Sequence, residues 1–572
     1  MRNYDHINAL PPEGIDVKRA HIVGGGIAGL AAAAFLVSDA HMPAENVTVY
    51  ESLDVVGGAL DAGGDPRAGY TARGGRELEP SSECMWYLCG KIPSLQTPGL
   101  TVLDETHRVN VEEPIYATYR LMERQGALHE ITGTMLSPAD GQKQLELLLT
   151  PEEQLEGLTI QDWFSPEFTD SPFWLLWSSM LAFRPYHSLI EAKRYLSRYA
   201  QYAGGIVHQK GILHTQYNEY DSIVRPLQVW LEGQGVRFRT STHVRDIETQ
   251  DQGNETLATA LVFDDPAGRH RTELTRDDLV FFTNGSLTQN STAGDTDTVV
   301  ALNRDTSDRG IFTIWDQLAA RDPKFGRPAA FISDIDRSNF YSFMTTITGD
   351  PTFFDYMRAK TGSAAPMCGA NTIVDSSWKL TVGLQGKYYP GQPDDVHVFW
   401  AYGQISDVPG DYVKKPMQDC TGAEMLAELL YHCGLEDKID QILRHAAVRT
   451  TAMPYITAQF QPRQIADRPK VIPDGCINLA FMGQFAESPG DCVFTVETSV
   501  RHAMIAVWGL TELDKPMIPR YEPLYDIRVL ADNLKVSTGG DTLKVETLLG
   551  AAPAADPKVL DDLLSRLPEP TI

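Results

Sequence analysis

Hydrophobic and polar positions near the start of the chain follow the pattern of a strand, a tight turn and a helix. A short apolar run from Ala20 to Val23 leads into Gly24-x-Gly26-x-x-Gly29, and an Ala- and Leu-rich segment typical of a buried helix follows. A second β-type run, Val47 to Tyr50, ends at the acidic residue Glu51. This order predicts the βαβ unit of a dinucleotide-binding fold.

Each glycine of this motif has a separate expected role. Gly24 makes the tight turn, Gly26 lets the backbone approach a pyrophosphate, and Gly29 lets the helix pack closely on the strand. The N-terminus of the helix offers unpaired N–H groups and a positive dipole to phosphates. Glu51 is placed to accept both hydroxyl groups of an adenosine ribose.

Glycines downstream of Glu51 indicate which dinucleotide is bound. The doublet Gly57-Gly58 resembles the FAD-binding pattern of the glutathione-reductase and amine-oxidase type flavoproteins, so FAD is the expected cofactor. We expect Gly58 and the loop Arg73-Gly74-Gly75 to lie nearer the flavin ring. Two later apolar runs, which end at Asn284 and at Gly483-Gln484, are typical of strands that bring the backbone back past the nucleotide.

The rest of the pattern alternates between helical and extended segments. Residues 151–203 are predicted to be helical and rich in large aromatic side chains, which form either ordinary core or the wall of a long apolar cavity. Strands are predicted near 372–374, 379–382 and 396–402, and a helix over 422–432. The fold class is therefore α/β: an FAD-binding Rossmann-like domain of the glutathione-reductase and amine-oxidase type, with an inserted α+β substrate domain and a C-terminal helical segment.

The predicted domains are discontinuous in sequence. The FAD-binding domain takes residues 1–85, 206–290 and 471–515. The substrate domain takes a mainly helical segment, 86–205, and a mixed α+β segment, 291–470; residues 516–572 form the C-terminal helical tail, with a short helix near 559–567.

Charge and cysteine usage narrow the classes of function. With 49 basic and 76 acidic residues the formal net charge is −27, which argues against nucleic acid as a partner and against docking on an anionic membrane by charge alone. The seven cysteines form no CxxC pair and no cluster with histidine at zinc-ligand spacing, so we expect reduced thiols and no metal. No signal peptide or membrane-spanning run is recognisable, and the predicted location is the cytoplasm.

Several separated segments resemble one family, the oleate hydratases, also called myosin-cross-reactive antigens. The resemblance is carried by Gly24 to Ala33, by Arg73-Gly-Gly-Arg-Glu-Leu-Glu79, by Tyr217-Asn-Glu-Tyr-Asp-Ser222, by Asp467-Arg-Pro-Lys470 and by Asn478 to Pro489. These segments occur in order along nearly the whole chain. The resemblance implies an FAD-dependent hydratase that adds water to the cis-9 double bond of an unsaturated fatty acid such as oleate, giving a 10-hydroxy acid.

The same resemblance implies two catalytic residues. Glu77, directly after the Arg-Gly-Gly-Arg loop, matches the glutamate that activates water, and Tyr195 matches the tyrosine that protonates the alkene. An ion pair with Arg73 or Arg76 is the alternative interpretation of Glu77, and plain packing is the alternative for Tyr195 and its neighbours Tyr199 and Tyr202. Because hydration is redox-neutral, FAD is expected to order the site and supply electrostatics rather than to consume electrons.

Recognition of the fatty-acid carboxylate is assigned to the segment that matches the family's head-group motif. Here it contains Gln385, Lys387 and Tyr389, which offer an amide N–H, a positive charge and a hydroxyl, whereas Glu219 stands where the family has glutamine. A long-chain unsaturated fatty acid is thus the expected partner, and the chain is either a homodimer or a monomer. Two other classes stay open: a flavin oxidase or desaturase of the amine-oxidase type, and a non-catalytic lipid-binding flavoprotein.

Overall fold

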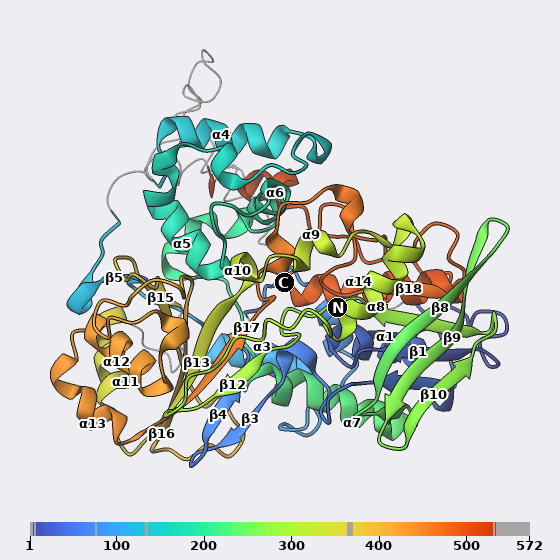
Figure 1. The fold of residues 1–572 in the computed structure, drawn as a ribbon, viewed down its shortest axis with the longest axis horizontal. Helices are drawn as coiled ribbons and strands as arrows, with labels where there is room; N and C mark the ends of the chain where they lie inside the picture. Colours follow the sequence, from blue (N-terminus) through green and yellow to red (C-terminus); the bar gives the residue numbers. More distant parts are fainter. Residues whose placement is uncertain are drawn as a thin grey trace.

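A computed structural model describes Tyr4 and residues 7–74, 77–131, 135–362, 370–529 and 532–533. A five-stranded parallel sheet, in the order β18-β11-β1-β2-β7, lies in the right-hand part of the molecule as seen in Figure 1. The strands come from distant parts of the chain: β1 (Arg19–Val23), β2 (Val47–Tyr50), β7 (Arg237–Arg239), β11 (Asp278–Thr283) and β18 (Leu479–Met482). The predicted fold class is therefore confirmed.

Helices pack on this sheet and bury its central strands. Helices α1 (Ile27–Ser38) and α14 (Val496–Thr511) pack on the strands and on each other, α7 (Arg225–Gln234) packs on α1, and α2 (Glu83–Cys89) packs on α14. Helix α1 is apolar on every side, with buried residues from Ile27 to Leu36, as expected for a helix enclosed by protein. A three-stranded antiparallel sheet projects beside it (Figure 1), made of β8 (His243–Gln252), β9 (Glu255–Asp265) and β10 (Gly268–Glu273).

An eight-stranded sheet forms the second half of the molecule, in the order β12-β17-β13-β16-β15-β14-β5-β6. Its strands are β5 (Leu121–Glu123), β6 (Ala127–Leu128), β12 (Thr292–Gly294), β13 (Phe340–Thr348), β14 (Asn371–Ile373), β15 (Leu380–Gln385), β16 (Val396–Gly403) and β17 (Ala446–Met453). Strands β5 and β6 pair antiparallel as a hairpin at the edge of this sheet. The hairpin lies within the segment predicted to be mainly helical, and β5 pairs in parallel with β14 of this sheet.

The two faces of the eight-stranded sheet have different neighbours. Leu380, Val382 and Leu384 of β15 point into a core shared with residues of α11 (Thr352–Thr361), α12 (Gly422–His432) and α13 (Ile439–Leu443). The alternate residues face the other way, toward the interior of the molecule. One face of the eight-stranded sheet is therefore covered by helices, and the other face is available to line a binding site. The short hairpin β3 (Ala62–Asp65) and β4 (Gly69–Ala72) packs against β13 and β17.

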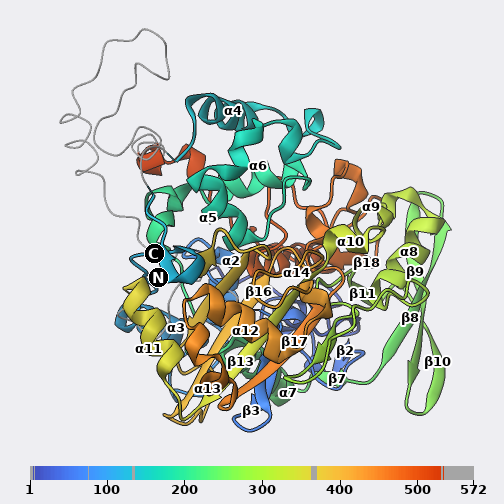
Figure 2. The same ribbon diagram turned by 60° about the vertical axis from the view of Figure 1, so that its left-hand side comes forward.

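A helical unit covers the top of the molecule in Figure 1, and Figure 2 shows it from another side. It comprises α4 (Pro138–Leu149), α5 (Pro172–Leu181) and α6 (Leu189–Arg198), and its aromatic residues, including Phe164, Trp174, Trp177 and Phe183, are buried in one core. The remaining helices are α3 (Val102–Glu112), α8 (Ile311–Arg321), α9 (Ala329–Ile332) and α10 (Ile335–Ser338). Within the described residues no helix is long and apolar enough to cross a bilayer. The predicted helix near 559–567 lies outside the described residues.

Candidate active site

A cavity of about 550 Å³ opens where the strands of the parallel sheet end. Its wall follows the carboxyl ends of four strands, at Gly24, Glu51, Thr283 and Gly483. This is the edge at which ligands bind in open α/β sheets. The predicted nucleotide residues Gly24, Gly26, Glu51 and Gly58 all line the cavity.

The glycine motif has the expected geometry. Gly24 has a φ of 104°, which only glycine adopts readily, and a Cβ on Gly29 would lie 2.1 Å from the carbonyl oxygen of Gly24. A Cβ on Gly26 would meet nothing closer than 4.0 Å, so the backbone there is open to the cavity. No side chain caps the first turn of α1, which leaves its N–H groups available to an anion.

The Glu51 carboxylate is fixed at the edge of this cavity. Oε2 accepts a hydrogen bond from the backbone N–H of Gly25 at 2.9 Å, and Oε1 accepts one from Leu53 at 2.9 Å. Oε1 also accepts from the Ser52 hydroxyl at 3.1 Å, whereas Oε2 has a second lone pair that can accept a ribose hydroxyl. Together with the uncapped helix and the open Gly26 backbone, this donor and acceptor set fits an adenine dinucleotide such as FAD.

Of the residues expected nearer the flavin ring, some line the cavity and others do not. Arg73 and Gly483-Gln484 line the cavity, whereas the Asn284 amide is buried and donates to the carbonyl oxygen of Phe485 at 2.9 Å. Asn284 therefore holds two strand ends together, and its neighbours Thr283 and Gly285 form the wall. Gly74 is buried with a φ of 135° and is not part of the wall, and Gly75 lies outside the described residues.

A second cavity, of about 150 Å³, lies against the inner face of the eight-stranded sheet. Alternate residues of two paired strands form this wall: Thr381, Gly383 and Gln385 of β15, and Trp400 and Tyr402 of β16. The two cavities have four wall residues in common, Arg73 and Phe494-Thr495-Val496. Helix α14 begins at Val496, so its N-terminus, the positive end of the helix dipole, stands at the junction of the cavities.

Glu77 lies on the wall of the second cavity. Its loop is held by two backbone hydrogen bonds between Leu78 and Leu213. The side chain is exposed to the cavity, and Oε1 accepts a hydrogen bond from Nε2 of Gln209. Burial of the surrounding region raises the pKa of Glu77, and the charge of Arg120 and the bond from Gln209 oppose that rise.

The alternative interpretation of Glu77 as an ion-pair partner of Arg73 is not supported by the contacts. Arg73 pairs with Asp61 at 3.0 Å and donates to the Thr288 hydroxyl at 3.2 Å. Arg76 lies outside the described residues. The Glu77 carboxylate lies on the cavity wall and accepts from Gln209, and the ion pair with Arg76 stays an open alternative.

Tyr195 is fully buried in the helical unit, among Phe183, Phe460 and Tyr199. Its hydroxyl oxygen accepts a hydrogen bond from the backbone N–H of Phe494 at 2.9 Å, and burial raises its pKa well above the ordinary value. It does not belong to the cavity wall, but Phe494 and Tyr199 do. The structure therefore places Tyr195 directly behind the wall.

Of the three residues predicted to bind the head group, Gln385 is the last residue of β15, and Lys387 and Tyr389 follow the end of that strand. Gln385 lines the cavity, and its Oε1 is buried without a hydrogen-bond partner in the described part of the chain. Lys387 points to the surface, where Nζ lies 2.6 Å from Asp394, and the Tyr389 hydroxyl donates to the carbonyl oxygen of Thr71 at 2.9 Å. Neither lines the cavity, which corrects the expectation, because the alternation of side chains ends with the strand.

Glu219 and Tyr388 occupy the cavity beside Gln385 instead. The Tyr388 hydroxyl lies 3.4 Å from Oε2 of Glu219 and donates to it. Sequence reasoning named Glu219 but not Tyr388. It also missed Gln209 and Arg120, since neither residue belongs to a motif, and only the fold brings them to Glu77.

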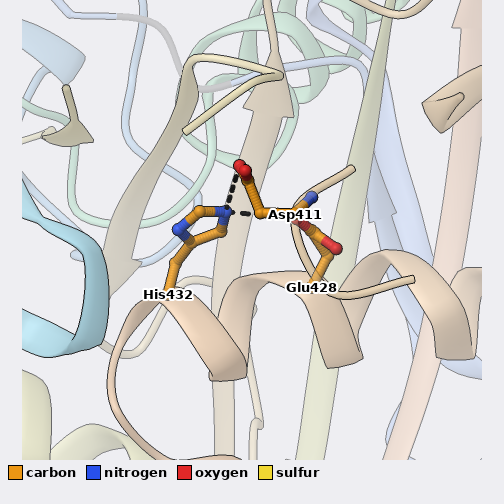
Figure 3. A group of neighbouring side chains, drawn as sticks. All are labelled: Asp411, Glu428 and His432. Carbon is orange, nitrogen blue, oxygen red and sulfur yellow. Dashed lines mark hydrogen bonds and ion pairs between the residues drawn. The ribbon is translucent and has the colours of Figure 1, made fainter. Parts of the chain in front are cut away.

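One group with metal-ligand spacing occurs in the described ranges, away from both cavities: Asp411, Glu428 and His432 (Figure 3). Nε2 of His432 lies 3.1 Å from Glu428 and 3.3 Å from Asp411. The carboxylates also accept hydrogen bonds from Arg124 and from the backbone N–H groups of Ser377 and residues 411–413. The role of this group is therefore structural: its hydrogen bonds hold the loop 411–413 on α12.

The model of the MCRA family matches residues 17–508. The chain belongs to the MCRA family. It is 37% identical over 529 residues to an oleate hydratase of Streptococcus pyogenes, covering 91% of this chain and 89% of that protein. It is 29% identical over 554 residues to a linoleate hydratase of Lactiplantibacillus plantarum, covering 88% and 96%. Among solved structures, cyclohexylamine oxidase of Brevibacterium oxydans is similar at 13% identity and a TM-score of 0.48, over 86% of this chain and 99% of that one.

Proposed function

We propose that this MCRA family member is an FAD-dependent hydratase that adds water to the cis-9 double bond of unsaturated fatty acids, converting oleate to 10-hydroxystearate. The observation that carries the proposal is the junction of two cavities. One fits a dinucleotide, the other is lined by apolar and aromatic residues and by Glu77, and they meet at Arg73 and the N-terminus of α14. Both hydratase relatives extend over nearly the whole chain.

Glu77 is the proposed base. Its carboxylate faces the cavity, where it can position a water molecule and accept a proton as the carbon–oxygen bond forms. Gly26, the first turn of α1 and Glu51 would hold FAD. When bound, FAD supplies electrostatic stabilisation near the cationic carbon and is not consumed.

Tyr195 stays the proposed proton donor. Its hydroxyl lies behind Phe494, at the junction of the cavities, and Tyr199 lies on the wall itself. Comparing Tyr195→Phe with Tyr199→Phe decides between them: the proton donor is the residue whose loss of the hydroxyl abolishes turnover while oleate still binds.

Gln385 is the proposed contact for the fatty-acid carboxylate, through its amide N–H, with the Tyr388 hydroxyl beside it. We also propose a cytoplasmic location, since the six described cysteines are free and buried. The division into domains given above and the choice between homodimer and monomer stay predictions.

The test is to incubate the FAD-loaded protein with oleic acid in water labelled with heavy oxygen. A hydratase incorporates the label as a hydroxyl group and consumes no oxygen. Oxygen consumption without labelled product would indicate an oxidase or desaturase, and binding without turnover would indicate a lipid-binding flavoprotein.

A further inference from the structure

Gln209 has a backbone conformation that its residue type does not favour. It follows the 3₁₀ helix η8 (Ala200–His208) with a φ of 56°, in the left-handed region preferred by glycine and asparagine. Its side chain is nevertheless buried and makes two hydrogen bonds. Nε2 donates to Oε1 of Glu77, and Oε1 accepts from the backbone N–H of Ala370 at 2.8 Å. A strained backbone that brings a buried amide to Glu77 indicates a role for that side chain.

Arg120 contacts the same residue, Ala370. Its guanidinium is buried, Nε donates to the carbonyl oxygen of Ala370 at 3.0 Å, and Nη1 donates to that of Ile206 at 2.9 Å. Nη2 is buried and has no hydrogen-bond partner in the part of the chain that the structure describes. Gln209 and Arg120 therefore use the N–H and the C=O of one residue, Ala370, and form a single framework behind the base.

We infer that Gln209 is a positioning residue that directs the Glu77 carboxylate into the cavity, with the buried Arg120 guanidinium supporting it from behind through Ala370. The inference rests on the proposed function of Glu77 as the base. Gln209 and Arg120 act through Glu77, since neither lines the second cavity.

The electrostatics agree with this geometry. Burial raises the pKa of Glu77 and so favours the protonated carboxyl, which cannot accept a proton, whereas Arg120 and the Gln209 amide oppose that rise and favour the ionised form. Arg73 and Glu79 on the same loop are paired with Asp61 and Arg198, and Glu497 of α14 is paired with Arg501. The other titratable groups that face the cavity are Glu219, His214, and tyrosines 199, 217, 388 and 402.

A direct test measures the protonation of Glu77 without relying on activity. Infrared difference spectra of the FAD-loaded protein, titrated with acid, identify the Glu77 carboxyl as the band that is missing in Glu77→Gln. In Gln209→Leu and in Arg120→Met the midpoint of that band should move to higher pH, by about one unit. Gln228→Leu is the matched control, because Gln228 donates to Glu232 on α7 and should leave the midpoint unchanged.

Kinetics distinguish positioning from general support of the fold. Gln209→Leu should lower kcat for oleate about tenfold or more with KM within about twofold, and raising the pH should restore part of the loss. In the Glu77→Gln background the same change should alter the residual kcat by less than about twofold, because its target is already absent.

Two further variants keep the inference testable where Gln209→Leu or Arg120→Met fails to fold. Gln209→Asn shortens the side chain and moves the amide away from Glu77, so it should raise the titration midpoint of the Glu77 carboxyl. Arg120→Lys keeps the positive charge, so it should raise that midpoint less than Arg120→Met does. An unchanged midpoint in folded Gln209 and Arg120 variants overturns the inference. If the unaltered protein forms no labelled hydroxy acid, the proposed function is overturned. The inference about Gln209 and Arg120 is still tested in that case, because the infrared titration measures the protonation of Glu77 without turnover.

Discussion

At the scale of single residues, the turn beside the nucleotide cavity requires residues without a Cβ atom. Gly29 has no Cβ, and one placed there would lie 2.1 Å from the carbonyl oxygen of Gly24. That oxygen belongs to a turn whose φ of 104° also requires glycine, so the conflict cannot be relieved by a side-chain movement. The motif predicted from spacing alone is thus explained by steric contact.

We predict that Gly29→Ala lowers the free energy of unfolding by about 1–3 kcal/mol and weakens FAD binding, because α1 must move away from β1. Chemical denaturation and flavin titration measure the two effects. Gly141 of α4 supplies the control, since a Cβ there meets nothing within 4 Å and alanine should stabilise the helix by about 0.5–1 kcal/mol. Equal stability changes at the two sites would contradict the steric account.

At the scale of elements, strand β15 separates core from cavity by its alternation. Leu380, Val382 and Leu384 enter the core, while Thr381, Gly383 and Gln385 face the cavity. The strand ends at Gln385, so the alternation does not extend to Lys387 or Tyr389. The wall position is taken instead by Tyr388, after a turn.

We predict that Gln385→Leu raises KM for oleate much more than for methyl oleate, since the amide serves the carboxylate and not the chain. Lys387→Met should leave both values unchanged, because Lys387 pairs with Asp394 at the surface. Steady-state kinetics with both substrates measure the difference. An equal rise for acid and ester would place the head group elsewhere.

Some elements of the fold could be predicted from the sequence, and others could not. The βαβ unit and the end of β18 were predictable because a local motif specifies a local turn, and α12 was predicted with both of its ends. The pairing of β5 with β14 was not, because parallel pairing over more than two hundred residues leaves no local pattern. Gln209 and Arg120 were missed for the same reason: only tertiary contacts bring Gln209 to Glu77 and join Gln209 to Arg120 through Ala370.

At the scale of the whole molecule, a buried ionic cluster joins the helical unit to the rest of the chain. Oε1 of Glu191, on α6, lies 2.8 Å from Arg463 and 2.8 Å from Arg468, and all three side chains are fully buried. Arg194 of the same helix pairs with Glu487 at 2.8 Å. The cluster therefore fixes the helix that carries Tyr195 against the segment leading to β18 and α14.

We predict that Glu191→Gln destabilises the protein by about 3–5 kcal/mol, because two buried guanidinium groups lose their counter-charge. Although burial alone would raise the pKa of Glu191, Arg468 and Arg463 lower it to about 2, below its unfolded value. This contribution to stability is thus present above about pH 4.5 and is lost as the pH falls toward 2. Acid unfolding of the two proteins measures it: the variant should lose less stability over that range, and parallel acid profiles would contradict the assignment.

The central claim is that Glu77, at the junction of the two cavities, activates water. It is tested most directly by measuring kcat and oleate affinity for Glu77→Gln with FAD bound. The account predicts a loss of about a hundredfold or more in kcat with oleate affinity nearly unchanged, because the carboxylate is needed in the transition state and not for binding. Near-normal turnover in the FAD-loaded variant would contradict it.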